Sequence, residues 1–224
     1  MKELIEYTSI DANNSCKEDA DENNGYWKLF YNSEICKSLT VESKFAEFAL
    51  TAIKKFFYIH NKGKIISLLD IGCGNGRDLN YFRKNGIDAY GIDLNSQNNT
   101  TYITNANALN ITDIYDVYYL RFFVHTLTES NLDKLLNKLY MIVKKESFIF
   151  LETRSSKGIT DKEKSETNFR SKIGEEHFRM LYSCDYLCEK LEKYFNIYFC
   201  NEDKGLAPFR GEDPYVIRMI LNEK

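Results

Sequence analysis

The chain has 224 residues, of which 43% are apolar and 28% charged. These are globular proportions, which exclude a disordered or fibrous protein, and the length predicts one domain. Thirty Lys and Arg against 33 Asp and Glu give a net charge of -3. That balance argues against electrostatic capture of nucleic acid or of an anionic membrane. We therefore expect neither partner, while the oligomeric state stays open.

The cysteines and histidines do not follow a metal-binding pattern. The six cysteines include no Cys-x-x-Cys pair, and His60, His125 and His177 complete no familiar zinc spacing, so no metal site is predicted. The N-terminal sequence lacks the basic and apolar segments of a signal peptide, and no apolar stretch is long enough to span a bilayer. We expect a cytoplasmic protein with reduced thiols.

The N-terminal part divides into an arm and a helix. Residues 1–25 are polar and acidic, which predicts a polar N-terminal arm, and residues 26–224 are expected to form a single domain. From Val41 to Phe56 the apolar positions recur at steps of three and four, the pattern of a helix that buries one face. This helix should end near His60 and belong to an N-terminal helical lid.

Short apolar runs then alternate with helical patterns. Strands are expected at residues 65–71, 89–93, 101–104, 116–120 and 147–152. Helices are expected at residues 77–84 and after Thr128, a suitable N-cap followed by Glu129 in the first turn. This alternation predicts a Rossmann-like, doubly wound α/β fold with helices on both faces of a parallel sheet.

The C-terminal part departs from this alternation. Residues 153–180 are charged and bury little, which predicts a long functional loop. Leu187 and Leu191 mark a last helix. Strands are then expected at residues 197–200 and 215–221, and the connection between them is too short for a crossover helix, so they should pair antiparallel. The complete sheet would have seven strands, mostly parallel with one antiparallel terminal strand.

The strongest local signal is the glycine-rich turn after the first strand. Gly72, Gly74 and Gly76 let the main chain turn sharply and approach a ligand, and the helix that follows offers unpaired N–H groups. A dinucleotide fingerprint requires a third glycine where this chain has Arg77. Asp93, at the end of the second strand, suits the ribose hydroxyls of either cofactor. The glycine spacing therefore favours S-adenosylmethionine over NAD.

With Asp70 before the turn, residues 40–152 and the terminal strand pair resemble the class I S-adenosylmethionine-dependent methyltransferases. The resemblance implies that Asp70 borders the methionine part of the cofactor, that Asp93 binds the ribose and that Leu94 covers the adenine. Asn107 stands where many members carry Asp, although its carbonyl oxygen can still accept a hydrogen bond. The implied cofactor-binding residues are Asp70, Gly72, Cys73, Gly74, Asn75, Arg77, Asp93, Leu94, Asn107, Ala108 and Tyr119.

The reaction centre is expected where the fourth strand ends. Residues 115–121 look like the family's fourth motif, so Tyr119 and Arg121 should face the sulfonium. For Tyr119, ordinary core packing is an equal alternative. His125 follows the same strand and is either a catalytic base or a buried structural histidine.

A second group of cationic residues belongs to the charged segment. Arg154 ends the fifth strand, and Arg170, His177 and Arg179 follow within residues 153–180. Guanidinium groups at this edge would match a phosphate or related anion, whereas the alternative is a solvated loop. Arg210 is a further candidate, and Trp27, Tyr31 and Phe45 are candidates to close the pocket.

A narrower resemblance links these segments. The sequences GCGNGRD and YLRFFVH, then Glu152-Thr153-Arg154-Ser155, His177-x-Arg179 and Glu212-Asp213-Pro214, look like a bacterial group connected with surface polysaccharides. Methyltransferases proposed to form the O-methyl phosphoramidate group of capsules belong to it. The resemblance implies a small anionic acceptor, nucleotide-linked or phosphorylated. The candidate catalytic residues are Arg121, Arg154, His177, Arg179, Tyr119 and His125.

Two alternatives stay open at this point. The first is an O- or N-methyltransferase of a sugar or other small metabolite, in which His125 or His177 would take a proton. The second is a subunit that binds S-adenosylmethionine without catalysis.

Overall fold

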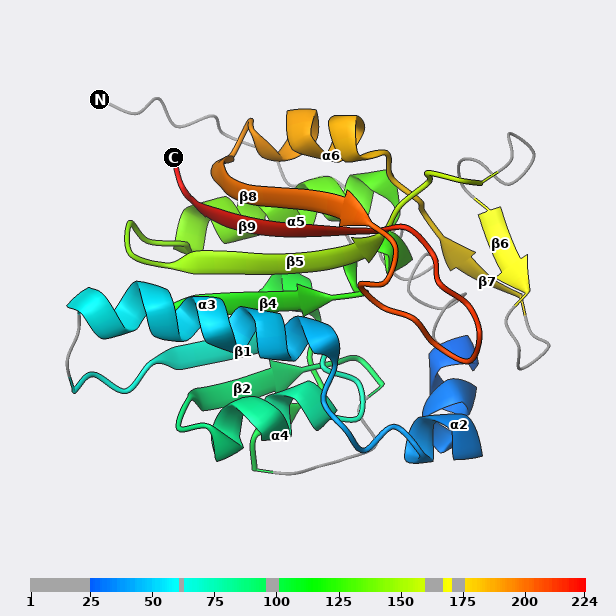
Figure 1. The fold of residues 1–224 in the computed structure, drawn as a ribbon, viewed down its shortest axis with the longest axis horizontal. Coiled ribbons are helices and arrows are strands. Elements are labelled where there is room, and N and C mark those ends of the chain that lie inside the picture. Colours follow the sequence, from blue (N-terminus) through cyan, green and yellow to red (C-terminus); the bar gives the residue numbers. More distant parts are fainter. Residues whose placement is uncertain (1–24, 61–62, 96–100, 160–166, 171–175) are drawn as a thin grey trace, which may run out of the picture.

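The computed structural model describes residues 25–60, 63–95, 101–159, 167–170 and 176–224, and side chains for most of them. One seven-stranded sheet with the order β3-β2-β1-β4-β5-β9-β8 forms its centre (Figure 1). Neighbours from β3 to β5 pair parallel, and β9 pairs antiparallel with β5 and β8. This confirms the predicted sheet with one antiparallel strand. The strands are β1 Ser67–Ile71, β2 Asp88–Ile92, β3 Ile103–Thr104, β4 Val117–Arg121, β5 Phe148–Arg154, β8 Phe195–Asp203 and β9 Val216–Glu223.

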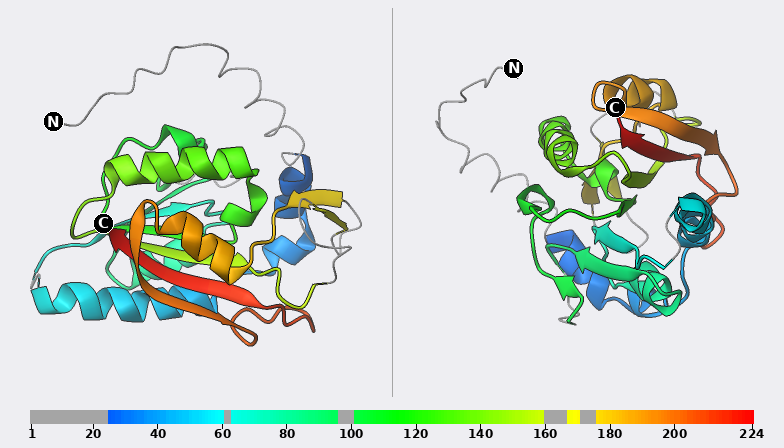
Figure 2. Two further views of the ribbon diagram at one scale, coloured as in Figure 1. Left: turned by 90° about the horizontal axis from the view of Figure 1, so that it is seen from above. Right: turned by 90° about the vertical axis from the view of Figure 1, so that its left-hand side faces the viewer.

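Helices cover both faces of the sheet (Figures 1 and 2). On one face lie α3 (Lys44–His60) and α4 (Arg77–Lys84), and on the other lie α5 (Glu129–Ile142) and α6 (Cys184–Leu191). Helical residues 25–32 and α2 (Glu34–Lys37) lie near the carboxyl ends of the strands. Among the described helices, none has the length and apolarity needed to cross a bilayer.

The strands are apolar because both faces of the sheet are covered. In β4, Val117 and Tyr119 pack on the α3 and α4 face, while Tyr118 and Leu120 pack on the α5 and α6 face. All four are at most 1% exposed. A parallel strand buried on both sides has no polar face, which explains why β1, β4 and β5 appear in the sequence as continuous apolar runs.

The helix expected from Val41 begins three residues later, at Lys44. The Ser43 hydroxyl accepts a hydrogen bond from the Ala46 N–H at 3.1 Å and so satisfies one unpaired donor of the first turn. Val41 lies outside the helix and is 68% exposed. The predicted cap of α5 is confirmed, since the Thr128 side chain accepts from the Asn131 N–H.

The expectation of an irregular segment at 153–180 is wrong in part. Residues β6 Thr167–Arg170 and β7 Glu176–Arg179 form an antiparallel pair separate from the main sheet. This pairing is held from outside the segment, because His177 in β7 is buried against the ring of Tyr26. The predicted arm lies outside the described residues except for its last residue, Gly25.

Candidate active site

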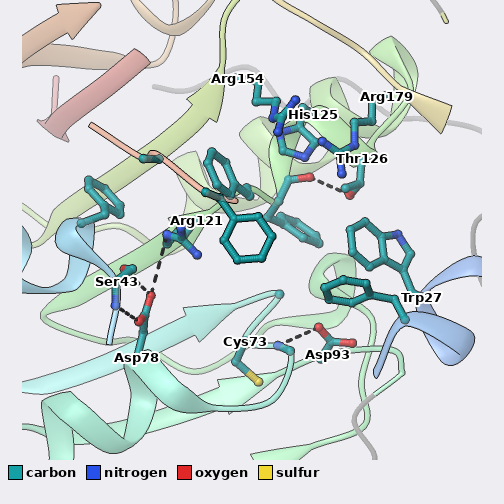
Figure 3. A pocket seen from close by; sticks show the side chains of 18 of the residues that line it. Trp27, Ser43, Cys73, Asp78, Asp93, Arg121, His125, Thr126, Arg154 and Arg179 are labelled. Carbon is teal, nitrogen blue, oxygen red and sulfur yellow. Dashed lines mark hydrogen bonds and ion pairs between the residues drawn. The ribbon is translucent and has the colours of Figure 1, made fainter. Parts of the chain in front are cut away.

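The carboxyl ends of the parallel strands open into a cavity of about 1000 Å³ (Figure 3). Helical residues 25–32, the strand β7 and residues 204–215 supply its outer walls. Arg170 lies on β6, and its side chain is outside the described part of the chain. The other residues predicted to bind cofactor or acceptor all line the cavity: Asp70, Gly72, Cys73, Gly74, Asn75, Arg77, Asp93, Leu94, Asn107, Ala108, Tyr119, Arg121, His125, Arg154, His177 and Arg179.

The glycine turn connects β1 to α4. Gly72 has a φ of +75°, and a Cβ at this residue would lie 2.5 Å from the Phe123 ring. Only glycine fits here without strain. The Gly72 N–H donates to the Ile92 carbonyl at 2.8 Å, which fixes the turn against the end of β2. As a result the next glycine, Gly74, directs its N–H toward Asp93 at 3.0 Å.

Asp93 is the acid at the end of β2. Its Oδ2 accepts hydrogen bonds from the Gly74 N–H and from the Tyr31 hydroxyl at 3.2 Å, and its Oδ1 accepts from the Asn95 N–H at 2.8 Å. A carboxylate can accept hydrogen bonds from the two hydroxyls of a ribose. Glycines without a Cβ leave room beside it for the part of the cofactor attached to that ribose. The residues present therefore fit an adenosyl cofactor.

Leu94, Asn107 and Ala108 line the side of the cavity where the family resemblance places the adenine. Leu94 is 45% exposed at the cavity, and Ala108 is buried. The Asn107 Oδ1 accepts from the Leu109 N–H at 2.9 Å and caps the short helix η1 (Ala108–Asn110). A carbonyl oxygen has two lone pairs, so Asn107 can still accept from an exocyclic amino group.

Three residues of the predicted cofactor set also shape the wall. The Asn75 amide donates to the Leu39 carbonyl at 2.9 Å, and Arg77 donates to the Val41 carbonyl at 3.2 Å. Both bonds hold the chain before α3 against the turn. Cys73 packs on Gly91 so closely that a Cβ there would lie 2.7 Å from its Sγ.

Asp78 was not among the residues predicted from sequence. It is 6% exposed in the first turn of α4, and its oxygens accept from the Ser43 N–H and hydroxyl, each at 2.7 Å, and from the Tyr119 hydroxyl at 2.9 Å. An acid in a first helical turn is common, which is why the pattern did not single it out. Tyr119 is fully buried and packs between the rings of Phe45 and Phe82. These contacts agree with core packing, the alternative that the sequence left open for this residue.

Arg121 belongs to a buried ion network. Its Nε lies 3.0 Å from Glu152 and 4.0 Å from Asp78, and Glu152 also accepts from Arg218 Nε at 2.7 Å. Glu152 is completely buried, and burial raises its pKa while the two arginines oppose that shift. The network connects β4, β5 and β9 and fixes the direction of the Arg121 guanidinium, which points toward Asp78 in Figure 3.

After Arg121 the chain turns through Phe122, a non-glycine residue with a φ of +52°. The left-handed region is sterically costly for such a side chain, and the Phe122 N–H is held by the Glu152 carbonyl at 2.8 Å. The turn leads into the short helix η2 (Val124–Thr126), which places His125 at the cavity. No feature of the sequence signals this turn.

His125, Arg154 and Arg179 gather on one side of the cavity (Figure 3). Arg179 Nε donates to His177 Nε2 at 2.7 Å, and Arg154 lies 3.5 Å from Glu212. His125 is 1% exposed, and its Nδ1 lies 3.3 Å from the Thr153 hydroxyl. Among the described residues, His125 Nε2 has no hydrogen-bond partner.

The charges of the cavity are separated. Burial, together with Arg179 and Arg154, holds the pKa of His125 well below its usual range, so the imidazole is neutral at pH 7. Burial and Arg154 lower the pKa of Arg179 to about 10. At the opposite end, burial and the neighbouring acids Asp78 and Asp93 raise the pKa of Asp70 well above its usual range. Asp70, Asp78 and Asp93 therefore lie at one end, together with Arg77 and Arg121, and Arg154 and Arg179 lie at the other, together with Glu212.

An acid at the end of the second strand and a glycine turn at the carboxyl ends of parallel strands, in a sheet that contains an antiparallel terminal strand, are the features of a class I S-adenosylmethionine-dependent methyltransferase. Residues 41–194 match a family described as a methyltransferase domain, and the chain belongs to this family. S-adenosylmethionine is its cofactor, as the glycine spacing predicted.

Solved structures with the same fold include an S-adenosylmethionine-dependent methyltransferase from Methanosarcina mazei, 18% identical, with a TM-score of 0.62 over 74% of this chain and 96% of that one. A second is the 1,6-didemethyltoxoflavin-N1-methyltransferase of Burkholderia thailandensis, bound to 1,6-didemethyltoxoflavin and S-adenosylhomocysteine. It is 12% identical, with a TM-score of 0.66 over 97% of this chain and 93% of that one. A third is an S-adenosylmethionine-dependent methyltransferase from Clostridium acetobutylicum. It is 12% identical, with a TM-score of 0.62 over 89% of this chain and 99% of that one. No curated protein matches the chain.

Proposed function

We propose that the enzyme transfers a methyl group to an oxygen of a small anionic acceptor of the phosphoryl or phosphoramidate type. The observation that carries this proposal is the cationic end of the cavity, where Arg154, Arg179 and the buried His125 converge. The pKa of Arg179 is lowered because burial and the neighbouring Arg154 both disfavour its positive charge. A bound anion would supply negative charge through paired, charge-assisted hydrogen bonds.

The acidic end suits the other reactant. S-adenosylmethionine supplies an electrophilic methyl group on a positively charged sulfonium, and Asp70 and Asp93 would hold the cationic and hydroxyl-bearing parts of this donor. Arg121 would stand between the two ends, its direction fixed by Glu152. In a displacement of this kind, alignment of the reactants and exclusion of water can lower the barrier by about 7–11 kcal/mol at best.

His125 acts in this proposal as a hydrogen-bond donor. When the Thr153 hydroxyl donates to Nδ1, the proton of the neutral ring is on Nε2, the atom that has no partner among the described residues. A lowered pKa makes the imidazole a weak base. An anionic phosphoryl oxygen needs no proton removed, so the weak base is not a disadvantage. Tyr119 and His177 would be positioning residues, through Asp78 and Arg179 respectively.

The surface-polysaccharide role is the finer part of the proposal. The segments behind the narrower resemblance come from distant parts of the chain, and residues from each of them line the same cavity, including Arg154, Ser155, Asp213 and Pro214. The five described cysteines are free thiols, which suits a reducing compartment such as the cytoplasm. We place the enzyme at the step that methylates a phosphorus-containing precursor of such a polysaccharide.

Kinetics with defined acceptors test the proposal. Purified protein with S-adenosylmethionine should form S-adenosylhomocysteine with a phosphoramidate or phosphate monoester, free or nucleotide-linked. Arg154→Ala should raise the acceptor KM at least about tenfold or abolish turnover, since charged hydrogen bonds contribute roughly 1.5–3 kcal/mol. Cofactor affinity should not change, and Arg154→Lys should recover only part of the activity because Lys lacks the planar fork.

Arg83→Ala is a matched control, because Arg83 interacts with the Ala89 carbonyl and Asp88 and does not line the cavity. Unaltered kinetics of Arg154→Ala would contradict the anionic acceptor. The alternative is a neutral sugar hydroxyl or an amine, as in the N-methyltransferases that share the fold. Turnover of a neutral acceptor at a rate that rises with pH through the histidine range would favour it.

A further inference from the structure

Three cysteine thiols meet between α6 and β8, and none of them lines the active-site cavity. Cys200 Sγ lies 3.3 Å from Cys184 Sγ and 3.8 Å from Cys188 Sγ. All three sulfur atoms lie within 4.8 Å of one another. Within the described part of the chain, no other group of three metal-ligating side chains is as compact.

The helix presents two of the three thiols together. The Ser183 side chain accepts from the Tyr186 N–H at 3.2 Å and caps α6, so that the helix begins at Cys184. Cys188 follows one turn later, and residues four apart lie on the same helix face.

A bulge in β8 supplies the third thiol. The pairing of β8 with β9 shifts register between Ile197 and Phe199. Tyr198 and Phe199 both turn toward α3, where their rings lie 5.1 Å from Phe56 and 5.4 Å from Phe48. Two consecutive side chains on one face reverse the alternation of the strand, which directs Cys200 to the opposite face and α6.

The spacing of the sulfur atoms suits a thiolate-coordinated metal ion. Zn–S bonds of about 2.3 Å in a tetrahedron place sulfur atoms about 3.8 Å apart. Ligand sets made only of sulfur select thiophilic ions such as Zn²⁺ over Mg²⁺ or Ca²⁺. Cys184 and Cys188 are half-buried and Cys200 is exposed, so an ion can reach the cluster from solvent.

We propose that Cys184, Cys188 and Cys200 form a binding site for a thiophilic metal ion of the Zn²⁺ class, with the fourth position open to water or a small thiol. The bound ion would connect α6 to the edge strand β8. This inference does not depend on the methyl acceptor. Sequence spacing predicted no metal because the third ligand comes from a bulged strand 12 residues after Cys188.

Titration of the reduced full-length protein with Co²⁺ and then Zn²⁺ tests the site. We expect sulfur-to-cobalt charge-transfer absorption and tetrahedral visible bands that saturate near one equivalent and are displaced by Zn²⁺. We expect metal affinity to fall roughly tenfold or more in each of the variants Cys184→Ser, Cys188→Ser and Cys200→Ser. Substituting a residue that only hydrogen-bonds to a metal ligand already lowers affinity by about this factor.

Cys36→Ser is the matched control, because Cys36 is a buried thiol from a different part of the fold, and its titration should equal that of the wild type. Circular dichroism would show that each variant is folded, and S-adenosylhomocysteine binding would show it for the three variants of the cluster, whose cysteines do not line the cavity. The proposal is overturned if the reduced protein binds no ion at stoichiometric levels, or if Cys200→Ser binds Co²⁺ with the wild-type spectrum. A Cys184–Cys200 disulfide on mild oxidation, without metal binding by the thiols, would likewise overturn it.

Discussion

At the scale of single residues, the protonation state of His125 favours an anionic acceptor over a neutral hydroxyl or amine. The ring is buried, and its surroundings include Arg121, Arg154, Arg179 and His177, all of which disfavour a positive charge. A neutral imidazole whose Nε2 has no hydrogen-bond partner among the described residues can donate to an anion. The same surroundings make it a poor acceptor for the proton of a hydroxyl group.

His125 also predicts how stability depends on pH. Its folded-state pKa is lowered, so its neutral form stabilises the protein above the unfolded-state pKa of about 6.5, and this contribution is lost as the pH falls below that value. The free energy of unfolding should fall by up to about 1.4 kcal/mol per pH unit for this one proton. Urea denaturation of the wild type and His125→Gln between about pH 8 and 5 would measure the difference, and equal slopes would contradict the assignment.

Asp78 connects α4, the helix after the glycine turn, to Ser43 before α3 and to Tyr119 in β4. Removing Asp78 would leave the Ser43 N–H without its acceptor, and the Ser43 and Tyr119 hydroxyls, 3.3 Å apart, with only each other to donate to among the described residues. Asp78→Ala should therefore lower the free energy of unfolding by about 3 kcal/mol. Asp88→Ala, which removes an acid half-exposed at the start of β2, should cost less than about 1 kcal/mol. Equal effects in urea denaturation would show that the network does not stabilise the fold.

At the scale of elements, helical residues 25–32 cover the glycine turn. Tyr31 binds Asp93, and Trp27 lies beside it on the same helix, with its ring 6.1 Å from that of Tyr31. Because Tyr31 already donates to the carboxylate that we propose for the cofactor ribose, we expect this helix to shift when the cofactor binds. Trp27 is the single tryptophan of the chain, so its fluorescence would report the shift directly.

Tyr31→Phe removes the hydroxyl that competes for Asp93. We predict that S-adenosylhomocysteine binds this variant a few-fold to about tenfold more tightly, equivalent to one hydrogen bond of roughly 0.5–1.5 kcal/mol. Titration calorimetry of both proteins gives the comparison. Weaker binding by the variant would mean that Tyr31 contacts the cofactor and does not compete with it.

At the scale of the whole molecule, the sheet and its ligand edge could be predicted from sequence because both follow from local patterns. Apolar runs predicted β1, β4 and β5, and the glycine turn with Asp93 predicted residues that line the cavity. Residues that depend on tertiary packing could not be predicted. Asp78 resembles any acid in a first helical turn, Phe122 adopts a left-handed conformation that no local pattern signals, and β6 and β7 have too few apolar residues for a strand pattern.

The separation of charge across the cavity is also a property of the whole fold. Asp70, Asp78 and Asp93 come from β1, from α4 and from the residue after β2, whereas Arg154 and Arg179 come from β5 and β7. The overall charge of -3 conceals this arrangement. An anionic acceptor and a cationic donor would each be attracted to its own end, with the reacting atoms between them.

A structure of the enzyme with S-adenosylhomocysteine and a phosphoramidate or phosphate monoester would test this arrangement most directly. We predict that the ribose hydroxyls bind Asp93 in place of Tyr31, and that the phosphoryl oxygens lie within hydrogen-bond distance of Arg154 and His125 Nε2. A phosphoryl group bound away from these two residues, with the cofactor in place, would contradict the account.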